Sequence, residues 1–221
     1  MKIAFAGKGG SGKTTLSSLF VRHLAGQGLP VVAIDADINQ HLAEAFGAAD
    51  PPPMGSHLLQ IKGYLRGSNP RISSAAAMVK TTPPGRGSRL LRPGGPDPVH
   101  DLAIGTPCGA RLLATGPFSE DDLGVACYHS KTGAVELYLN HLADGPGEYV
   151  VVDCTAGADS FASGLFTRFD LTVLVAAHPQ GPQRVPAVAG IRRRLRRRHG
   201  AGGKQGAERR GRGISPPARG R

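Results

Sequence analysis

Cysteine is scarce in this sequence, and long apolar runs are absent from it. The three cysteines, Cys108, Cys127 and Cys154, are too few and too scattered to form a disulfide framework. The first apolar run ends at Gly7, too early for a secretory leader, and the longest later run, Leu171–Ala177, is far too short to span a membrane. These absences predict a soluble, cytoplasmic protein without a transmembrane segment.

Acidic residues are almost absent from the last part of the chain, and the formal net charge is +11. Residues 1–178 contain 14 Lys and Arg against 15 Asp and Glu, whereas residues 179–221 contain 13 against one, Glu208. The basic character therefore belongs to the tail 179–221, and residues 1–178 are expected to form the folded domain. The tail has no periodic apolar face that would dock as a strand or helix, so we expect a disordered, low-complexity segment.

Three interpretations of this basic tail remain open. It is an arm that binds nucleic acid or an anionic surface by neutralising phosphates, or a solvated appendage without a role. The third is out-of-frame translation of a GC-rich gene, whose codons readily give Arg, Gly, Pro and Ala. The abrupt change of composition at residues 178–179 favours a frame shift or truncation.

A glycine-rich stretch near the start of the chain carries the strongest functional signal. Residues 7–15 fit the Walker A pattern G-x-x-x-x-G-K-T. Its glycines allow successive backbone N–H groups to converge on phosphate oxygens. Lys13 is expected to reach the β- and γ-phosphates, and the Thr14 hydroxyl to complete the shell of a Mg²⁺ ion. The residues expected to bind the nucleotide here are Gly7, Gly9, Gly10, Ser11, Gly12, Lys13, Thr14 and Thr15.

The segments around this loop predict an α/β fold. Residues 2–6 and 31–35 suit buried strands and are separated by a helical pattern, and residues 149–153 and 171–175 are further apolar runs without alternation. Such strands imply a mostly parallel, doubly wound sheet that binds its ligand at the carboxyl ends of the strands. Residues 51–101 are rich in Pro and Gly and are expected to form a loop-rich insertion.

Two acidic motifs fall at strand ends, where a magnesium-bound nucleotide requires carboxylates. Asp35 and Asp37 follow the second strand, so one carboxylate can approach Mg²⁺ through water and the other can orient the attacking water. Alternatively, Asp37 or Asn39 merely caps the short helix that follows. Asp153 ends a later strand in the manner of a Walker B residue, which holds Mg²⁺ indirectly. Gly157, four residues on, can direct its N–H at the γ-phosphate.

Lys8 gives the loop the form Lys-Gly-Gly-x-Gly-Lys-Thr-Thr, which resembles the deviant Walker A loop of the MinD/ParA superfamily. That group includes the nitrogenase iron protein, the arsenite-pump ATPase and the CooC-type nickel-insertion ATPases. The resemblance implies a P-loop ATPase that works as a nucleotide-sandwich homodimer, with Lys8 acting on the nucleotide of the facing subunit and Lys13 on its own. A solvated loop lysine is the alternative for Lys8. The resemblance covers residues 1 to about 178.

The same resemblance implies roles for the acidic motifs. Asp37 would position the attacking water, Asp35 would support the metal side, and residues 153–157 correspond to the switch II motif Asp-x-x-Ala-Gly. Ile38 stands where relatives commonly carry proline. The catalytic residues implied are Lys8, Lys13 and Asp37, and those implied for Mg²⁺ are Thr14, Asp35 and Asp153.

A Cys-x-His pair, Cys127 and His129, stands where CooC-like proteins carry a Cys-x-Cys pair that binds a metal between subunits. Two such pairs facing each other would supply two sulfurs and two nitrogens, a suitable set for Zn²⁺ or Ni²⁺. The alternative is a partly buried cysteine next to a histidine that flanks a helix.

Together these signals predict an ATPase nearest the CooC-like branch, in which hydrolysis drives a maturation or partner-switching step on an unknown client. A ParA- or MinD-like positioning ATPase that binds DNA or membrane is one alternative. Another is a defective, truncated fragment, because relatives continue past the 171–175 strand into a segment that contacts the adenine base. No Asn-Lys-x-Asp guanine motif occurs, so the preference for ATP over GTP rests on the resemblance.

Overall fold

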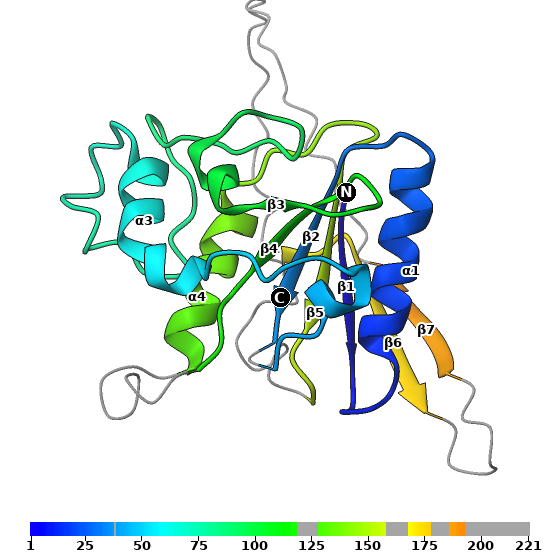
Figure 1. Cartoon of the computed structure of the whole chain (residues 1–221). Coiled ribbons are helices and arrows are strands. Elements are labelled where there is room, and N and C mark those ends of the chain that lie inside the picture. The colour runs from blue at the N-terminus through cyan, green and yellow to red at the C-terminus, as the bar shows by residue number, and fades with distance from the viewer. Residues whose placement is uncertain (38, 119–127, 158–167, 178–185, 193–221) are drawn as a thin grey trace, which may run out of the picture.

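A single seven-stranded sheet organises the chain (Figure 1), in the order β3-β4-β2-β5-β1-β6-β7. The computed structural model describes residues 1–37, 39–118, 128–157, 168–177 and 186–192. The five central strands are parallel to one another, and the two edge strands, β3 and β7, are antiparallel to their neighbours. The predicted mostly parallel α/β sheet is therefore confirmed.

The strands form where the sequence has short apolar runs. The central ones are buried along almost their whole length, because helices cover both faces of the sheet. The strands are β1 (Lys2–Gly7), β2 (Val31–Ala36), β3 (Ile104–Gly105), β4 (Arg111–Ala114), β5 (Tyr149–Cys154), β6 (Leu171–Ala177) and β7 (Pro186–Arg192).

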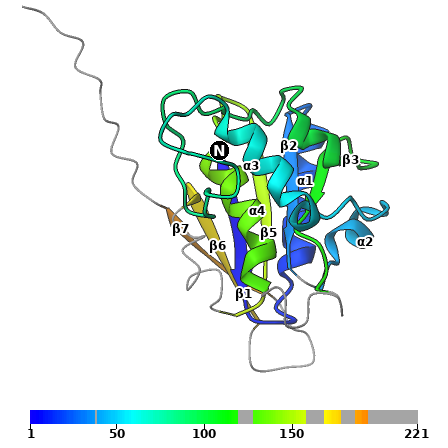
Figure 2. The same ribbon diagram turned by 90° about the vertical axis from the view of Figure 1, so that its left-hand side faces the viewer.

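Helices cover the sheet in two layers. The helices are α1 (Lys13–Gly26), α2 (Leu42–Phe46), α3 (Leu58–Arg66) and α4 (Tyr128–Asn140), with the 3₁₀ turns η1 (Met54–His57) and η2 (Pro98–Leu102). One apolar core joins α1 and α2 to one face of the sheet, and a second joins α3 and α4 to the other. Figure 2 shows α3 and α4 in front of the strands and α1 behind them.

Residues 51–101 contain a helix that the sequence analysis did not predict. Helix α3 begins after η1 and buries Ile61 and Leu65 in the core that it shares with α4. The signal was present, because Leu58, Ile61 and Leu65 recur at helical spacing. The expectation of a loop-rich insertion holds only for the stretch between α3 and η2, in which no helix or strand forms.

One strand, β7, lies beyond residue 178, within the segment for which we expected no docked strand. Strand β7 pairs antiparallel with β6, from Ala177 opposite Pro186 to Leu171 opposite Arg192. Without this partner, β6 would leave a row of unpaired N–H and C=O groups along the edge of the sheet. Pro186 stands at the first position of the strand, where a residue without an N–H is tolerated.

The register of the central strands places one group of polar residues together. Asp35 of β2 lies opposite Asp153 of β5, and Phe5 of β1 lies opposite the same Asp153. The loops that leave these strands therefore meet at one edge of the sheet, at its carboxyl end. In the described part of the chain, no helix combines the length and the apolar character that crossing a bilayer would require.

Candidate functional site

The loop between β1 and α1 contains glycines whose conformation or surroundings disfavour a side chain. A Cβ atom on Gly7 would lie 2.1 Å from the carbonyl oxygen of Val175, which is backbone and cannot move aside. Gly10 and Gly12 have φ angles of 71° and 95°, in the left-handed region that favours glycine. The backbone conformation of this loop is therefore one that favours glycine at these positions.

The backbone N–H groups at the amino end of α1 are not capped by a side chain. Gly12 is its N-cap, which makes no side-chain cap hydrogen bond, and no acidic residue lies in the first turn. The first-turn N–H groups and the helix dipole therefore both favour a bound phosphate. Lys13 is buried, and its Nζ donates to the carbonyl oxygen of Lys8 over 3.5 Å. The Ser11 hydroxyl is buried and forms no hydrogen bond within the described part of the chain.

Thr14 and Asp153 join the glycine loop to the end of β5. The Thr14 hydroxyl donates to Oδ2 of Asp153 over 2.6 Å, and Oδ1 of the same carboxylate is buried with no hydrogen-bond partner among the residues that the structure describes. Burial raises the pKa of Asp153 to about 7; the Thr14 hydrogen bond opposes this shift, and the Asp35 carboxylate adds to it. A hydroxyl and an under-coordinated carboxylate oxygen are ligands that suit Mg²⁺, so these residues fit the ion.

Asp35 holds the backbone of the loop after β2. Its Oδ1 accepts the N–H of Asp37 over 3.1 Å, and its Oδ2 accepts the N–H groups of His41 and Leu42 over 3.1 and 2.9 Å. Burial raises the pKa of Asp35 to about 6, and these backbone donors counteract part of the shift. The carboxylate that binds the start of α2 is thus Asp35, and neither Asp37 nor Asn39 makes a side-chain cap there.

Asp37 and Gly157 lie in the two loops that face each other across this edge. The Thr155 hydroxyl donates to Oδ1 of Asp37 over 3.4 Å, a contact that the sequence reading did not anticipate. The N–H of Gly157 donates to the carbonyl oxygen of Gly7 over 3.0 Å. The expected contact of Gly157 with a γ-phosphate would require this bond to open, and it stays a prediction.

The remaining predicted site residues differ in how far the structure describes them. Lys8, Gly9 and Thr15 are exposed, and Lys8 forms no ion pair with any other described residue. Cys127 lies outside the described residues, and of His129 only the backbone is described. Within the described ranges, no three His, Cys, Asp or Glu side chains cluster as a metal site would need.

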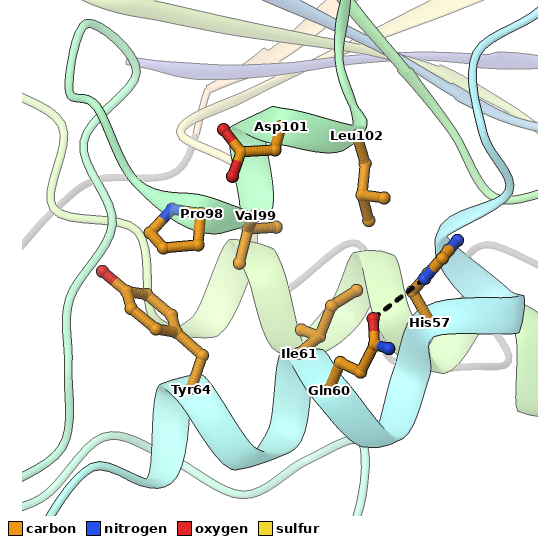
Figure 3. Close-up of a pocket in the computed structure, with 8 residues that line it drawn as sticks. All are labelled: His57, Gln60, Ile61, Tyr64, Pro98, Val99, Asp101 and Leu102. Atoms are coloured by element: carbon orange, nitrogen blue, oxygen red, sulfur yellow. Dashed lines mark hydrogen bonds between the residues drawn. The ribbon is translucent and has the colours of Figure 1, made fainter.

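A separate hollow of about 310 Å³ lies between α3 and η2 (Figure 3), and no motif in the sequence pointed to it. Ile61 contributes to its apolar lining. The polar groups at its edge are engaged within the chain: His57 Nδ1 lies 2.9 Å from Oε1 of Gln60, and the Tyr64 hydroxyl donates to Asp97 over 2.9 Å. None of the residues that line it belongs to the glycine loop or the acidic motifs.

Residues 2–191 match the model of the CobQ/CobB/MinD/ParA nucleotide binding domain. The chain belongs to this family. The resemblance deduced from Lys8 and the two acidic motifs is thereby confirmed. In this chain Thr14 donates to Asp153 at one edge of the sheet, and the charge of Lys13 is close enough to Asp153 to oppose the rise of its pKa.

Two relatives are about 30% identical to this CobQ/CobB/MinD/ParA-family chain over the aligned residues. It is 31% identical over 175 residues to the carbon monoxide dehydrogenase accessory protein CooC of Rhodospirillum rubrum. It is 30% identical over 178 residues to an uncharacterized ATP-binding protein of Methanocaldococcus jannaschii. Each match covers 79% of this chain and 62% of the relative, so the chain spans about three fifths of the length of these proteins.

Among solved structures, the kinase domain of the Escherichia coli tyrosine kinase ETK is similar to the chain with a TM-score of 0.46 and 16% sequence identity. The similarity covers 81% of this chain and 56% of that one. These values are too low to support any conclusion.

Proposed function

We propose that this protein binds Mg·ATP at the loop between β1 and α1 and hydrolyses it. The observation that carries the proposal is the hydrogen bond between Thr14 and Asp153, because it joins the phosphate loop to the carboxylate at the end of β5. Two further observations support it: Oδ1 of Asp153 has no hydrogen-bond partner in the described ranges, and the start of α1 has no side-chain cap, so each offers a polar group to a ligand.

Each residue of the site has a distinct task in this reaction. The first-turn N–H groups of α1 and the ammonium of Lys13 bind the phosphates and neutralise developing charge. Thr14 and Asp153 would hold Mg²⁺, which supplies further positive charge against the phosphate oxygens. Asp35 keeps the loop after β2 in place through its three backbone hydrogen bonds. Asp37 orients the attacking water, so catalysis rests on positioning and electrostatics rather than on covalent chemistry.

The active form is a homodimer that closes over two nucleotides. Lys8 is exposed beside the phosphate loop and has no ion-pair partner among the described residues, so its ammonium is available to a facing subunit. Closing the dimer would bring it to the other nucleotide, and hydrolysis would release it. This reading predicts dimerisation that depends on both ATP and Lys8.

The dimer cycle drives a maturation or partner-switching step. Support comes from the similarity to the CooC accessory protein of carbon monoxide dehydrogenase, which is 31% identical over the shared region. A metal held between subunits by Cys127 and His129, Ni²⁺ or Zn²⁺, is the form of this step that the sequence suggests. Mass spectrometry of the native dimer with and without added Ni²⁺ or Zn²⁺ tests it; a Cys127→Ser dimer that keeps the metal would contradict it.

ATP turnover by the purified chain tests the main proposal. Lys13→Ala should abolish Mg²⁺-dependent release of phosphate, while Lys62→Ala, which changes a lysine of α3 away from the loop, should not. Lys8→Ala should leave nucleotide binding intact and remove both dimerisation and turnover, as measured by calorimetry and sedimentation. A folded chain that binds no nucleotide in calorimetry would refute the proposal.

A second candidate function rests on the segregation of charge. Residues 179–221 hold 13 Lys and Arg and one acid, which suits a ParA- or MinD-like positioning ATPase that binds nucleic acid or an anionic membrane. Its affinity for a DNA duplex should fall steeply with salt, and replacing the five arginines at 193, 194 and 196–198 by glutamine should flatten that dependence. Binding that is indifferent to these arginines would exclude this candidate.

A further inference from the structure

The pairing of β2 with β5 brings Thr155 to Asp37. Asp35 lies opposite Asp153 and Ala36 opposite Cys154, so the residues that follow these two strands leave the sheet side by side. At that point the Thr155 hydroxyl donates to Oδ1 of Asp37 over 3.4 Å. Hydrogen bonds of catalytic groups are often long before the substrate is bound and tighten in the complex.

Oδ1 of Asp37 is held from two loops at once. It accepts the N–H of Asn39 from its own loop over 3.1 Å, in addition to the Thr155 hydroxyl from the loop after β5. The backbone of Asp37 is fixed as well, because its N–H donates to Oδ1 of Asp35. The other oxygen of Asp37, Oδ2, makes no hydrogen bond to any residue that the structure describes.

We propose that Thr155 is a positioning residue for Asp37. By occupying Oδ1 together with Asn39, it fixes the rotation of the carboxylate and leaves Oδ2 to accept a proton of the attacking water. The inference rests on the proposed function, in which Asp37 orients that water. Thr155 touches neither nucleotide nor water in this role and acts only through Asp37.

The arrangement also links water positioning to the state of the loop after β5. Thr155 lies between Asp153, which bonds to Thr14, and Gly157, which bonds to Gly7. A change at either of these contacts displaces the Thr155 hydroxyl, and with it the orientation of Asp37. The chain would therefore position water only when the loop after β5 is correctly placed over the phosphate loop.

Two substitutions at Thr155 separate the hydroxyl from the shape of the side chain. Thr155→Val removes the hydroxyl and keeps the volume, and should lower kcat about tenfold with KM for ATP changed less than about twofold. Thr155→Ser keeps the hydroxyl and should restore most of that kcat. Thr106→Val removes a hydroxyl that donates to Ala110 far from the site; it should lower Tm without changing kcat.

A double-variant cycle tests whether Thr155 acts through Asp37. Asp37→Asn should itself lower kcat at least about tenfold, and Thr155→Val should then cause no further loss, because the two groups act as a unit. In a readout that needs no turnover, Thr155→Val should weaken binding of ADP with aluminium fluoride and Mg²⁺ about tenfold by calorimetry while ADP alone binds as before.

The outcomes separate failure of this inference from failure of the proposed function. A Thr155→Val protein with the parental kcat, beside an impaired Asp37→Asn protein, overturns the inference and leaves the ATPase proposal standing. Equal losses from Thr155→Val in both backgrounds also overturn it. An Asp37→Asn protein with full turnover removes the water-positioning role of Asp37 and the inference with it, whereas absence of any Lys13-dependent turnover in the parent refutes the ATPase itself.

Discussion

Gly157 donates its backbone N–H to the carbonyl oxygen of Gly7 over 3.0 Å, so the loop after β5 is fastened to the first residue of the phosphate loop. Gly7 also packs against the end of β6, where its α-carbon faces the carbonyl oxygen of Val175. One residue therefore connects the ends of β1, β5 and β6. Changes at this point should affect the fold and the site together.

Gly7→Ala should lower the stability of the fold, and not only change the properties of the site. The added Cβ would meet the Val175 oxygen at 2.1 Å, and neither backbone can yield, so we expect a loss of at least about 3 kcal/mol in the free energy of unfolding. Gly10→Ala is the matched control, since nothing lies within 4 Å of its Cβ and its cost is the strain of a φ of 71°, about 1–2 kcal/mol. Urea titration followed by circular dichroism measures both, and equal costs would contradict the role of the close approach.

Asp153→Asn should stabilise the nucleotide-free protein at pH 8 and abolish its turnover. The pKa of Asp153 is about 7 in the folded chain against an ordinary value of 3.8, so the folded state binds the proton more tightly than the unfolded state does. The carboxylate therefore costs stability progressively as pH rises from about 4 through 7, and little below that. Removing it should add on the order of 2 kcal/mol at pH 8 and almost nothing at pH 4.

Asp144→Asn provides a control of opposite sign for this pH dependence. Asp144 forms an ion pair with Lys2 at 3.1 Å, and its pKa lies below the ordinary value, since the hydrogen bond with the Met1 amino group and the charge of Lys2 outweigh burial. Its stabilising effect is present above about pH 4 and is lost as pH falls through the folded pKa. Asp144→Asn should therefore lower Tm at pH 8; a rise would contradict the assignment.

Removal of Lys80 should destabilise the protein more than removal of its whole ion pair. Its Nζ lies 2.9 Å from Oε1 of Glu136, whose side chain is 1% exposed. Lys80→Met leaves that carboxylate buried without its charge partner and should cost about 3 kcal/mol. Lys80→Met combined with Glu136→Leu should recover most of this loss, as measured by urea unfolding; a double variant as unstable as the single one would show that packing, and not charge, is at stake.

His141 should make the protein sensitive to mild acid. The ring is fully buried, its Nδ1 lies 3.0 Å from the carbonyl oxygen of Leu137, and its Nε2 bonds to no group that the structure describes. Burial lowers the pKa of His141 below the ordinary 6.5, so the unfolded chain takes up a proton first and stability is lost as pH falls through about 6.5. His141→Met should reduce the difference in Tm between pH 7.5 and pH 5.5; an unchanged difference would assign the effect to other groups.

The parts of this fold that the sequence predicted are those specified by local pattern. Uninterrupted apolar runs predicted β1, β2, β5 and β6 to within two residues, and the meeting of Thr14 with Asp153 followed from two motifs at strand ends. The contact of Thr155 with Asp37 could not be predicted in this way. It depends on the register of β2 against β5, which joins segments more than a hundred residues apart in the chain.

Two misses have compositional causes. The prolines at 51–53 and those that follow indicated a loop, although Leu58, Ile61 and Leu65 recur at helical spacing. The arginines that follow residue 191 likewise indicated a disordered tail, although the apolar segment before them forms β7. In both cases the element forms because an exposed sheet face or edge requires a partner, and that requirement is a property of the assembled sheet.

The antiparallel direction of β7 fixes where its arginine-rich continuation begins. Arg192 lies opposite Leu171, at the amino end of β6, whereas the phosphate loop meets Val175 near the carboxyl end of the same strand. A polyanion bound at Arg192 and a nucleotide bound at the glycine loop would therefore lie at opposite ends of β6. Two phosphate-bearing ligands could then reside on one protomer without competing for the same charges.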